Sequence, residues 1–138
     1  GGADLDPDQS QAGYLYVLPL FPLDGRVAAE AARWADGVAR EYNLDAAMTF
    51  NLVDDRCLEL VLSVSFRRDQ ADRVEAAHAC AERLQREFME QGYPPYRVGV
   101  QSMPLVVRED DAFWQVARDL KRVFDPNGII APGRYNLD

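Results

Sequence analysis

The sequence contains very little histidine and cysteine, which argues against the commonest metal and nucleophile sites. His78 is its only histidine, and its two cysteines, Cys57 and Cys80, do not form a CxxC pair. A zinc site needs several nitrogen or sulfur ligands, and a Ser-His-Asp triad has no other support around His78. We therefore expect no metal site, a structural role for His78 and two buried thiols in a reducing compartment.

The sequence is also short of basic residues and of long apolar runs. It has 15 Lys and Arg against 23 Asp and Glu, which gives a net charge of −8 over 138 residues. Nucleic-acid binding needs clustered Lys and Arg that neutralise phosphates, and a membrane-spanning helix needs about 18 or more apolar residues in a row. Since neither feature occurs, we expect neither nucleic acid nor a membrane as a partner.

Two further kinds of motif are missing. No pair of carboxylates has a spacing typical of acid–base catalysis, and Asn127-Gly128 and Pro132-Gly133 are turn signals that do not form a GxGxxG loop. Residues 1–13 lack the basic and apolar blocks of a signal peptide, so we expect a flexible acidic leader there.

What the chain does contain is a regular succession of strand and helix patterns. Runs rich in aromatic and β-branched residues predict strands at 14–23, 46–53, 57–66 and about 97–101. Apolar residues spaced by three and four predict helices at 26–42, 69–91 and 112–124. The order β-α-β-β-α-β predicts an α+β, ferredoxin-like antiparallel sheet with helices on one face. We expect this domain to cover residues 14–108, with a C-terminal helix and tail at 109–138.

Particular residues are expected to end these helices. Asp69 should cap the second helix, Gly92 should end it, and Asp110 or Asp111 should cap the third. The third helix is predicted to turn one apolar face inward, made of Phe113, Val116, Ala117, Leu120 and Val123.

The segment at 92–103, GYPPYRVGVQSM, holds the strongest candidate for a binding site. Pro94 and Pro95 fix their own φ angles and restrict their neighbours, so Tyr96 and Arg97 should project from a stiff elbow. A phenol hydroxyl and a guanidinium that converge on one oxygen can stabilise a phenolate or an enolate. A surface tyrosine beside an ion-paired arginine gives the same dipeptide, and spacing alone favours this second interpretation.

Tyr14 and Tyr16 alternate along the first predicted strand and should therefore share one face of the sheet. Packing in the core is the most frequent role for such a tyrosine. Stacking on a ligand and attack on a cofactor are the alternatives.

Four stretches resemble the C-terminal part of FAD-linked oxidases of the vanillyl-alcohol oxidase and 4-cresol dehydrogenase family. They are YLYVLPLFPLDG, DRCLELVLSVSFRRDQ, GYPPYRVGVQSM and the tail LKRVFDPNGIIAPGRYNLD. The tail is widespread among such flavoproteins, whereas the Tyr-Arg pair after a Gly-Tyr turn is typical of the phenol-oxidising branch. The resemblance implies the substrate, or cap, domain of a FAD-dependent enzyme that oxidises para-substituted phenols.

The resemblance also implies roles for individual residues. It implies that Tyr96 and Arg97 bind the phenolic oxygen and favour the phenolate, which then loses hydride from its benzylic carbon to the flavin. For Tyr14 it leaves three options: an O-tyrosyl link to FAD, a spacer beside a non-covalent flavin, or a small error of register in the match. It places Asn127 and Arg134 around the flavin.

Members of that family are several times longer than this chain. The resemblance therefore implies an upstream FAD-binding domain as a partner, and a chain that alone neither holds FAD tightly nor turns over substrate. A cytochrome electron acceptor and a homo-oligomer are the further partners that it allows, in the cytoplasm or, for an enzyme of the cresol dehydrogenase type, the periplasm. The alternative hypothesis is a stand-alone ferredoxin-like module for binding or self-association.

Overall fold

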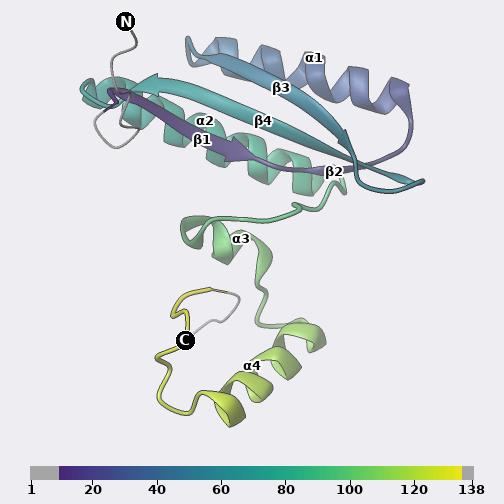
Figure 1. The fold of residues 1–138 in the computed structure, drawn as a ribbon, viewed down its shortest axis with the longest axis vertical. Coiled ribbons are helices and arrows are strands. Elements are labelled where there is room, and N and C mark those ends of the chain that lie inside the picture. The colour runs from purple at the N-terminus through teal and green to yellow at the C-terminus, as the bar shows by residue number, and fades with distance from the viewer. Residues whose placement is uncertain (1–9, 135–138) are drawn as a thin grey trace, which may run out of the picture. The chain divides into compact units, whose positions relative to one another are not determined.

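An antiparallel sheet with two helices on one face makes up most of the chain in the computed structural model, which describes residues 10–134 (Figure 1). The model divides at the bond between Tyr96 and Arg97 into two units. The first contains β1 (Ala12–Val17), β2 (Leu20–Pro22), α1 (Gly25–Glu41), β3 (Asp45–Leu52), β4 (Cys57–Arg67) and α2 (Ala71–Glu90). The second contains a 3₁₀ turn (Val100–Ser102), α3 (Met103–Val106) and α4 (Ala112–Phe124). The predicted leader falls largely outside the described residues, and the predicted boundary after residue 108 stays a prediction.

β4 is the central strand of the sheet. β1 and β2 pair with one side of β4 and β3 pairs with the other, all antiparallel. The register of β3 on β4 runs from Asp45 opposite Ser65 to Leu52 opposite Leu58. This confirms the predicted hairpin and the ferredoxin-like, antiparallel class of the fold.

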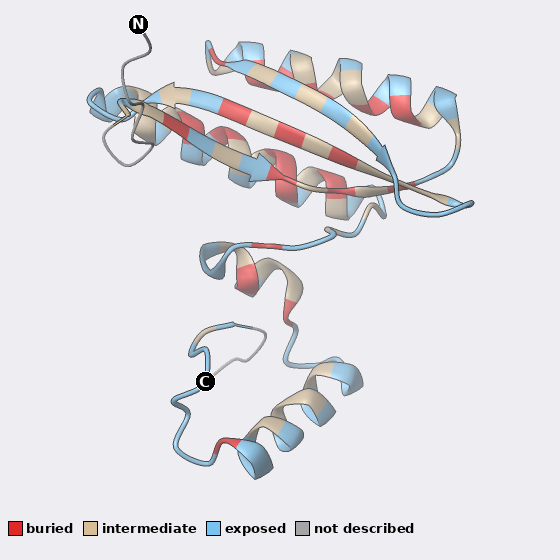
Figure 2. Ribbon diagram, in the orientation of Figure 1, coloured by how far each residue is buried: buried red, intermediate tan, exposed pale blue. Residues whose placement is uncertain are grey.

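The core lies between this sheet and the two long helices. Leu60, Leu62 and Val64 of β4 are 0% exposed and cluster with buried residues of both α1 and α2 (Figure 2). Since alternate residues of a strand point to the same face, both helices cover one face of the sheet. Among the described residues, no helix has the length and apolar content required to cross a membrane.

Aromatic rings join the sheet to the helices. Phe88 of α2 is 1% exposed and packs edge-on against Trp34 of α1, with 4.8 Å between ring centroids. It makes a similar contact with Phe21 of β2 at 5.6 Å. Tyr93, which follows α2, lies 4.5 Å from the ring of Phe21. These rings connect α1, β2 and the end of α2 in one cluster.

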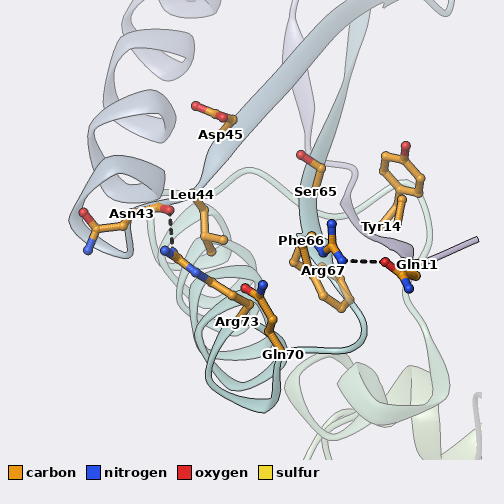
Figure 3. A pocket seen from close by; sticks show the side chains of 11 residues that line it. Gln11, Tyr14, Asn43, Leu44, Asp45, Ser65, Phe66, Arg67, Gln70 and Arg73 are labelled. Atoms are coloured by element: carbon orange, nitrogen blue, oxygen red, sulfur yellow. Dashed lines mark hydrogen bonds between the residues drawn. The ribbon is translucent and has the colours of Figure 1, made fainter.

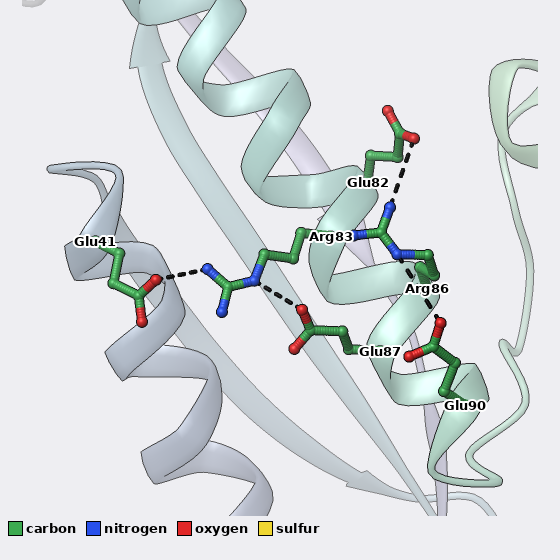
Figure 4. A network of polar contacts seen from close by, with 6 residues as sticks. All are labelled: Glu41, Glu82, Arg83, Arg86, Glu87 and Glu90. Carbon is green, nitrogen blue, oxygen red and sulfur yellow. Dashed lines mark hydrogen bonds and ion pairs between the residues drawn. The ribbon is translucent and has the colours of Figure 1, made fainter.

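Ion pairs also join α1 to α2. Arg83 of α2 donates hydrogen bonds to Glu41 at the end of α1 and to Glu87, at 2.6 and 2.7 Å (Figure 4). These carboxylates, Glu41 first, raise the pKa of Arg83 above its usual value.

The predicted strand at about 97–101 is wrong. Residues 94–96 pair instead with the segment where β1 leads into β2. Tyr96 N donates to Leu18 O at 2.7 Å, and Leu20 N donates to Pro94 O at 2.8 Å. Because Pro95 has no N–H, the pairing shrinks to a single bridge with Pro19. The fourth strand expected of a ferredoxin-like sheet is therefore reduced to this single bridge.

Helix α2 is capped differently from the prediction, whereas the other helix ends match it. The N-cap of α2 is Gln70, and Asp69 instead accepts a 2.9 Å hydrogen bond from Arg67 Nε. The hydrogen bond with Arg67 lowers the pKa of Asp69. Asp111 caps α4 by accepting from Phe113 N at 2.8 Å, and Gly92, with φ of 87°, ends α2.

Helix α4 has the predicted bounds but not the predicted burial. Phe113, Val116, Leu120 and Val123 are between 53% and 74% exposed. The buried cluster of the second unit consists of Val98, Met103 and Val107, with Val106 and Trp114 packed against it. Trp114 is the member of that cluster from α4, so the predicted inward face of α4 stays uncovered by residues 10–134.

Two phenylalanines test this account of the core. Phe88→Ala should lower the free energy of unfolding by about 3–5 kcal/mol, because it removes a buried ring and leaves a cavity. Phe113→Ala removes the same ring from an exposed position and should change it by less than about 0.5 kcal/mol. Denaturant unfolding followed by circular dichroism measures both values, and equal losses would contradict the account.

Candidate functional site

Tyr96 and Arg97 sit at the junction of the two units. The backbone of Tyr96 is fixed by its hydrogen bond to Leu18 O, while its side chain remains 48% exposed. Tyr93, just before the prolines, is anchored against Phe21 in the core. The elbow that presents Tyr96 is thus attached to the sheet on both sides of the two prolines.

Arg97 is exposed, and the backbone that follows it is fixed by the packing of the next residue. The next residue, Val98, is 6% exposed and packs with Met103 at the centre of the second unit's cluster. An exposed side chain between a bonded backbone and a buried neighbour is well placed to meet a ligand with little loss of backbone freedom.

Asp125 organises the turn that carries Asn127. Its carboxylate is 3% exposed and accepts hydrogen bonds from the backbone N–H groups of Ile129 and Ile130, at 3.0 and 2.8 Å. Lys121 of α4 donates to the same carboxylate and is the largest cause that lowers the pKa of Asp125 below 3.8. Asn127 is exposed in this fixed turn, as are the side chains of Ile129 and Ile130.

Arg134 belongs to a tail that returns to the segment after the elbow. Arg134 N donates to Ala131 O at 3.1 Å, closing a turn around Gly133, whose φ is 73°. A methyl group added at Gly133 would come within 3.4 Å of Val100 Cγ1. Within the second unit, the structure therefore brings the tail that carries Arg134 close to the segment that begins at Arg97.

Tyr14 lies on the face of the sheet that the helices leave open. It is 56% exposed and stands opposite Ser65, two residues before the equally exposed Tyr16. Tyr14 is therefore not a core residue, and its hydroxyl can meet a ligand.

A pocket of about 570 Å³ lies beside Tyr14, at the end of the sheet where α2 begins (Figure 3). Its charged lining residues are Arg67, Arg73 and Asp45; Arg67 is paired with Asp69, and Arg73 donates to Asn43 O at 3.0 Å. Its other lining residues are Gln11, Ala12, Tyr14, Asn43, Leu44, Ser65, Phe66 and Gln70. No sequence signal points to this pocket, because its walls come from distant segments that carry no motif. Of the predicted site residues, it contains Tyr14 alone.

The cysteines and the histidine are not drawn into any of these sites. Cys80 is fully buried, and desolvation raises the pKa of its thiol to about 11. Cys57 is only half-buried, so the prediction of burial is confirmed for Cys80 and wrong for Cys57. His78 is exposed, with its ring 6.4 Å from that of Phe66. In the part of the chain that the structure describes, no three potential metal ligands gather.

Comparison with known families and proteins gives consistent matches. The family model described as FAD linked oxidases, C-terminal domain, matches residues 23–135. The chain is 32% identical over 130 residues to the 4-cresol dehydrogenase [hydroxylating] flavoprotein subunit of Pseudomonas putida, covering 91% of this chain and 24% of that protein. It is 29% identical over 132 residues to the 1'-carboxy-chondrochloren decarboxylase of Chondromyces crocatus, covering 96% of this chain and 24% of that protein. The chain therefore spans about a quarter of the length of these relatives.

Solved structures agree with this match. The structure of p-cresol methylhydroxylase with substrate bound aligns with a TM-score of 0.83 and 30% identity, over 91% of this chain and 24% of that one. The 4-ethylphenol oxidase of Gulosibacter chungangensis, in an isoeugenol complex, aligns with a TM-score of 0.82 and 19% identity, over 93% of this chain and 25% of that one. At 19% identity, the match to the 4-ethylphenol oxidase shows similarity of fold alone.

The turn organised by Asp125 should depend on its charge. At neutral pH, Asp125→Asn should speed amide exchange at Ile129 and Ile130, because a neutral amide accepts these bonds more weakly. Asp119→Asn, at an exposed ion pair with Arg122, is the matched control and should leave those amides unchanged.

The same turn should respond to acid in the unmodified chain. Because folding lowers the pKa of Asp125, the stability this carboxylate contributes is present above the unfolded pKa near 3.8 and is lost as pH falls through the folded pKa. Exchange at Ile129, corrected for intrinsic exchange, should therefore accelerate as the pH falls below about 3.8, and a corrected rate that stays constant there would contradict this role.

Proposed function

The chain belongs to the family of FAD linked oxidase C-terminal domains, and we propose that it is the substrate-domain part of a FAD-dependent oxidoreductase acting on para-substituted phenols. The observation that carries this proposal is the Tyr96-Arg97 pair, presented on an elbow that is bonded to the sheet. Support also comes from the 32% identity to the 4-cresol dehydrogenase subunit.

Tyr96 and Arg97 are proposed to bind the phenolic oxygen of the substrate. A guanidinium offers several N–H donors in one plane, and the tyrosine hydroxyl adds another from the neighbouring position. Together they favour the phenolate over the phenol, because an anion gains more from fixed donors and a fixed positive charge than a neutral group does. The extra electron density reaches the benzylic carbon through the ring and makes loss of hydride from that carbon easier.

Each unit of this chain offers candidate contacts for a flavin, but they do not suffice to hold the whole cofactor. Tyr14 offers an exposed phenol on the open face of the sheet, and Asn127 and Arg134 are exposed in ordered turns of the second unit. The sequence has no glycine-rich loop to hold the pyrophosphate. Bound FAD supplies a hydride acceptor, and we propose that another part of a longer protein holds its pyrophosphate.

The exposed face of α4 supports such a partner. Phe113, Val116, Leu120 and Val123 form an apolar stripe on the helix, and Ile129 and Ile130, beyond the Asp125 turn, are exposed as well. Apolar surface of this extent usually marks an interface. We propose that the FAD-binding part covers it.

A stand-alone module for self-association is the second candidate. The observation in its favour is the same α4 stripe, which a second copy of the chain could also cover. This candidate assigns no role to Tyr96 and Arg97, so the following prediction separates the two.

Arg97→Ala, made in the FAD-loaded longer protein, should lower kcat/KM for a 4-alkylphenol on the order of 100-fold or more, as loss of an anion-stabilising donor does in other enzymes. FAD content should not change. Arg40→Ala is the matched control, because Arg40 is an exposed arginine of α1 whose guanidinium pairs with Asp36 at 2.8 Å. Near-normal turnover by the Arg97 variant would refute the assignment.

Tyr14 is proposed to carry the flavin through an O-tyrosyl link. Acid precipitation of the FAD-loaded protein should then leave the flavin with the protein, on a peptide containing Tyr14. Tyr14→Phe should release it and Tyr16→Phe should not. Retention of covalent flavin by the Tyr14 variant would refute the link, and acid release of flavin from the unmodified protein would make Tyr14 a spacer.

A further inference from the structure

Arg118, in the second turn of α4, carries a charged group whose partner is missing from the described chain. Its Nε and Nη2 atoms are shielded from solvent, and no atom of the described residues accepts a hydrogen bond from either. Buried polar groups in proteins nearly always have a hydrogen-bond partner, and a buried charge is costlier to leave unpaired than a neutral group. The two donors of Arg118 therefore indicate an acceptor that residues 10–134 do not supply.

The helix neighbours of Arg118 cannot neutralise it. A helical side chain reaches the residues three and four positions away. For Arg118 these residues are Trp114, Gln115, Lys121 and Arg122. None of them is acidic and two are positively charged, so α4 itself increases the need for an anion beside Arg118.

The carboxylates of the second unit are not available to Arg118 either. Four of the five that the structure describes are engaged by other groups. They are Asp110 with Arg108, Asp111 with Phe113 N, Asp119 with Arg122 and Asp125 with Lys121. The fifth, Glu109, is exposed. An acceptor for Arg118 must therefore come from outside residues 10–134.

The two unpartnered atoms are a pair that suits a carboxylate. Nε–H and one N–H of Nη2 lie parallel in the plane of the guanidinium, and together they match the two oxygens of a carboxylate. A backbone carbonyl offers a single oxygen and no negative charge, so it would leave the positive charge uncompensated. The geometry of the donors therefore favours an Asp or Glu side chain.

Arg118 lies at the margin of the second unit, where another part of a protein can reach it. Trp114, one turn earlier, packs against the buried cluster of that unit, whereas the side chain of Arg122, one turn later, is 60% exposed. Arg118 as a whole is half-buried. A change of side-chain rotamer, which is common at interfaces, can therefore turn its donors towards a group that packs on α4 from outside. Arg118 is about 200° around the helix from both Val116 and Leu120, so this contact is separate from the apolar stripe.

We propose that Arg118 binds an Asp or Glu side chain from the remaining part of a longer polypeptide, through two parallel hydrogen bonds from Nε and Nη2. This inference rests on the proposed function, which makes the chain part of a longer flavoprotein. The relatives and the solved structures match the chain over only 24% to 25% of their length, so most of such a polypeptide lies outside these 138 residues. Because both donors are shielded from solvent, a carboxylate fixed in a folded interface suits them better than an ion that exchanges with solution. Helix α4 is then held on two sides, by apolar contacts on one and by an ion pair on the other.

The sign of a stability change in the FAD-loaded longer protein tests the proposal. Arg118→Met keeps most of the apolar part of the side chain and removes its charge. If a carboxylate is bound, the variant leaves that carboxylate buried without a counter-charge, and the melting temperature measured by circular dichroism should fall by several degrees. If no acceptor is bound, the variant removes an unpaired buried charge, and the melting temperature should rise or stay the same, which would overturn the proposal.

Two further variants of α4 serve as controls. Arg122→Met removes an exposed arginine whose pair with Asp119 is 3.5 Å long, and it should change the melting temperature little. Arg118→Lys keeps a positive charge and should retain more stability than Arg118→Met does. Equal losses in the two Arg118 variants would show that the side chain matters for packing alone and would overturn the proposal.

The pH dependence of the loss identifies the acceptor. A carboxylate that has lost its counter-charge binds a proton more readily, because its pKa rises. The loss in Arg118→Met should therefore shrink as the pH is lowered from about 8 to about 5. A loss that is the same at both pH values would overturn the proposal, and if FAD is released as well, the acceptor is a phosphate of the cofactor. The same loss in Asp138→Asn would place the acceptor within this chain and would also overturn it.

These measurements report on the contact at Arg118 and not on turnover. A fully active Arg97→Ala variant would therefore refute the proposed function without deciding whether Arg118 is paired. A stable Arg118→Met variant would refute the ion pair and leave the role of Arg97 unaffected.

Discussion

Two backbone hydrogen bonds between the proline elbow and the segment where β1 leads into β2 are the constraint on which the rest of the structure depends. They join Tyr96 N to Leu18 O and Leu20 N to Pro94 O. The missing N–H of proline ends the pairing there, so the chain leaves the sheet after a single bridge. The same bonds close the first unit and fix the backbone from which Tyr96 and Arg97 project. If they were absent, the two donors would lie on a mobile loop and would lose part of their binding free energy in becoming ordered.

Outside the core, the described residues leave particular surfaces uncovered. The core around Phe88 is complete, with rings from α1, β2 and the end of α2 in mutual contact. In contrast, α4 turns an apolar face to solvent. Asp125 fixes the turn after α4 through two backbone hydrogen bonds, and Ile129 and Ile130 of that turn are also exposed. This distribution suits a domain that is completed by other parts of a longer protein.

The sequence predicted well what local physical chemistry decides. Apolar periodicity placed α1, α2 and α4 almost to the residue, and turn chemistry placed the β3–β4 hairpin. It failed where side chains compete for one partner or where distant segments meet. Asp69 was expected to cap α2, but the guanidinium of Arg67, two residues earlier, takes its carboxylate. Phe113 was expected to face inward but is exposed, because the helical pattern shows an apolar face without showing what covers it. The pocket beside Tyr14 depends on strand register, which a single sequence does not contain. The prolines and the dipeptide made Tyr96 and Arg97 a candidate site, and their proposed role comes from family resemblance.

Whether this elbow binds a phenolate is most directly tested by the ultraviolet difference spectrum of a bound phenol. The ligand should be a para-substituted phenol without a benzylic hydrogen, so that it binds to the FAD-loaded longer protein without reacting. Free phenols have a pKa of about 10, as tyrosine does, and are neutral at neutral pH. The account predicts a phenolate spectrum for the bound ligand at neutral pH, and its loss in Arg97→Gln. A bound ligand that stays neutral in the unmodified protein, or a phenolate spectrum that survives in the variant, would contradict it.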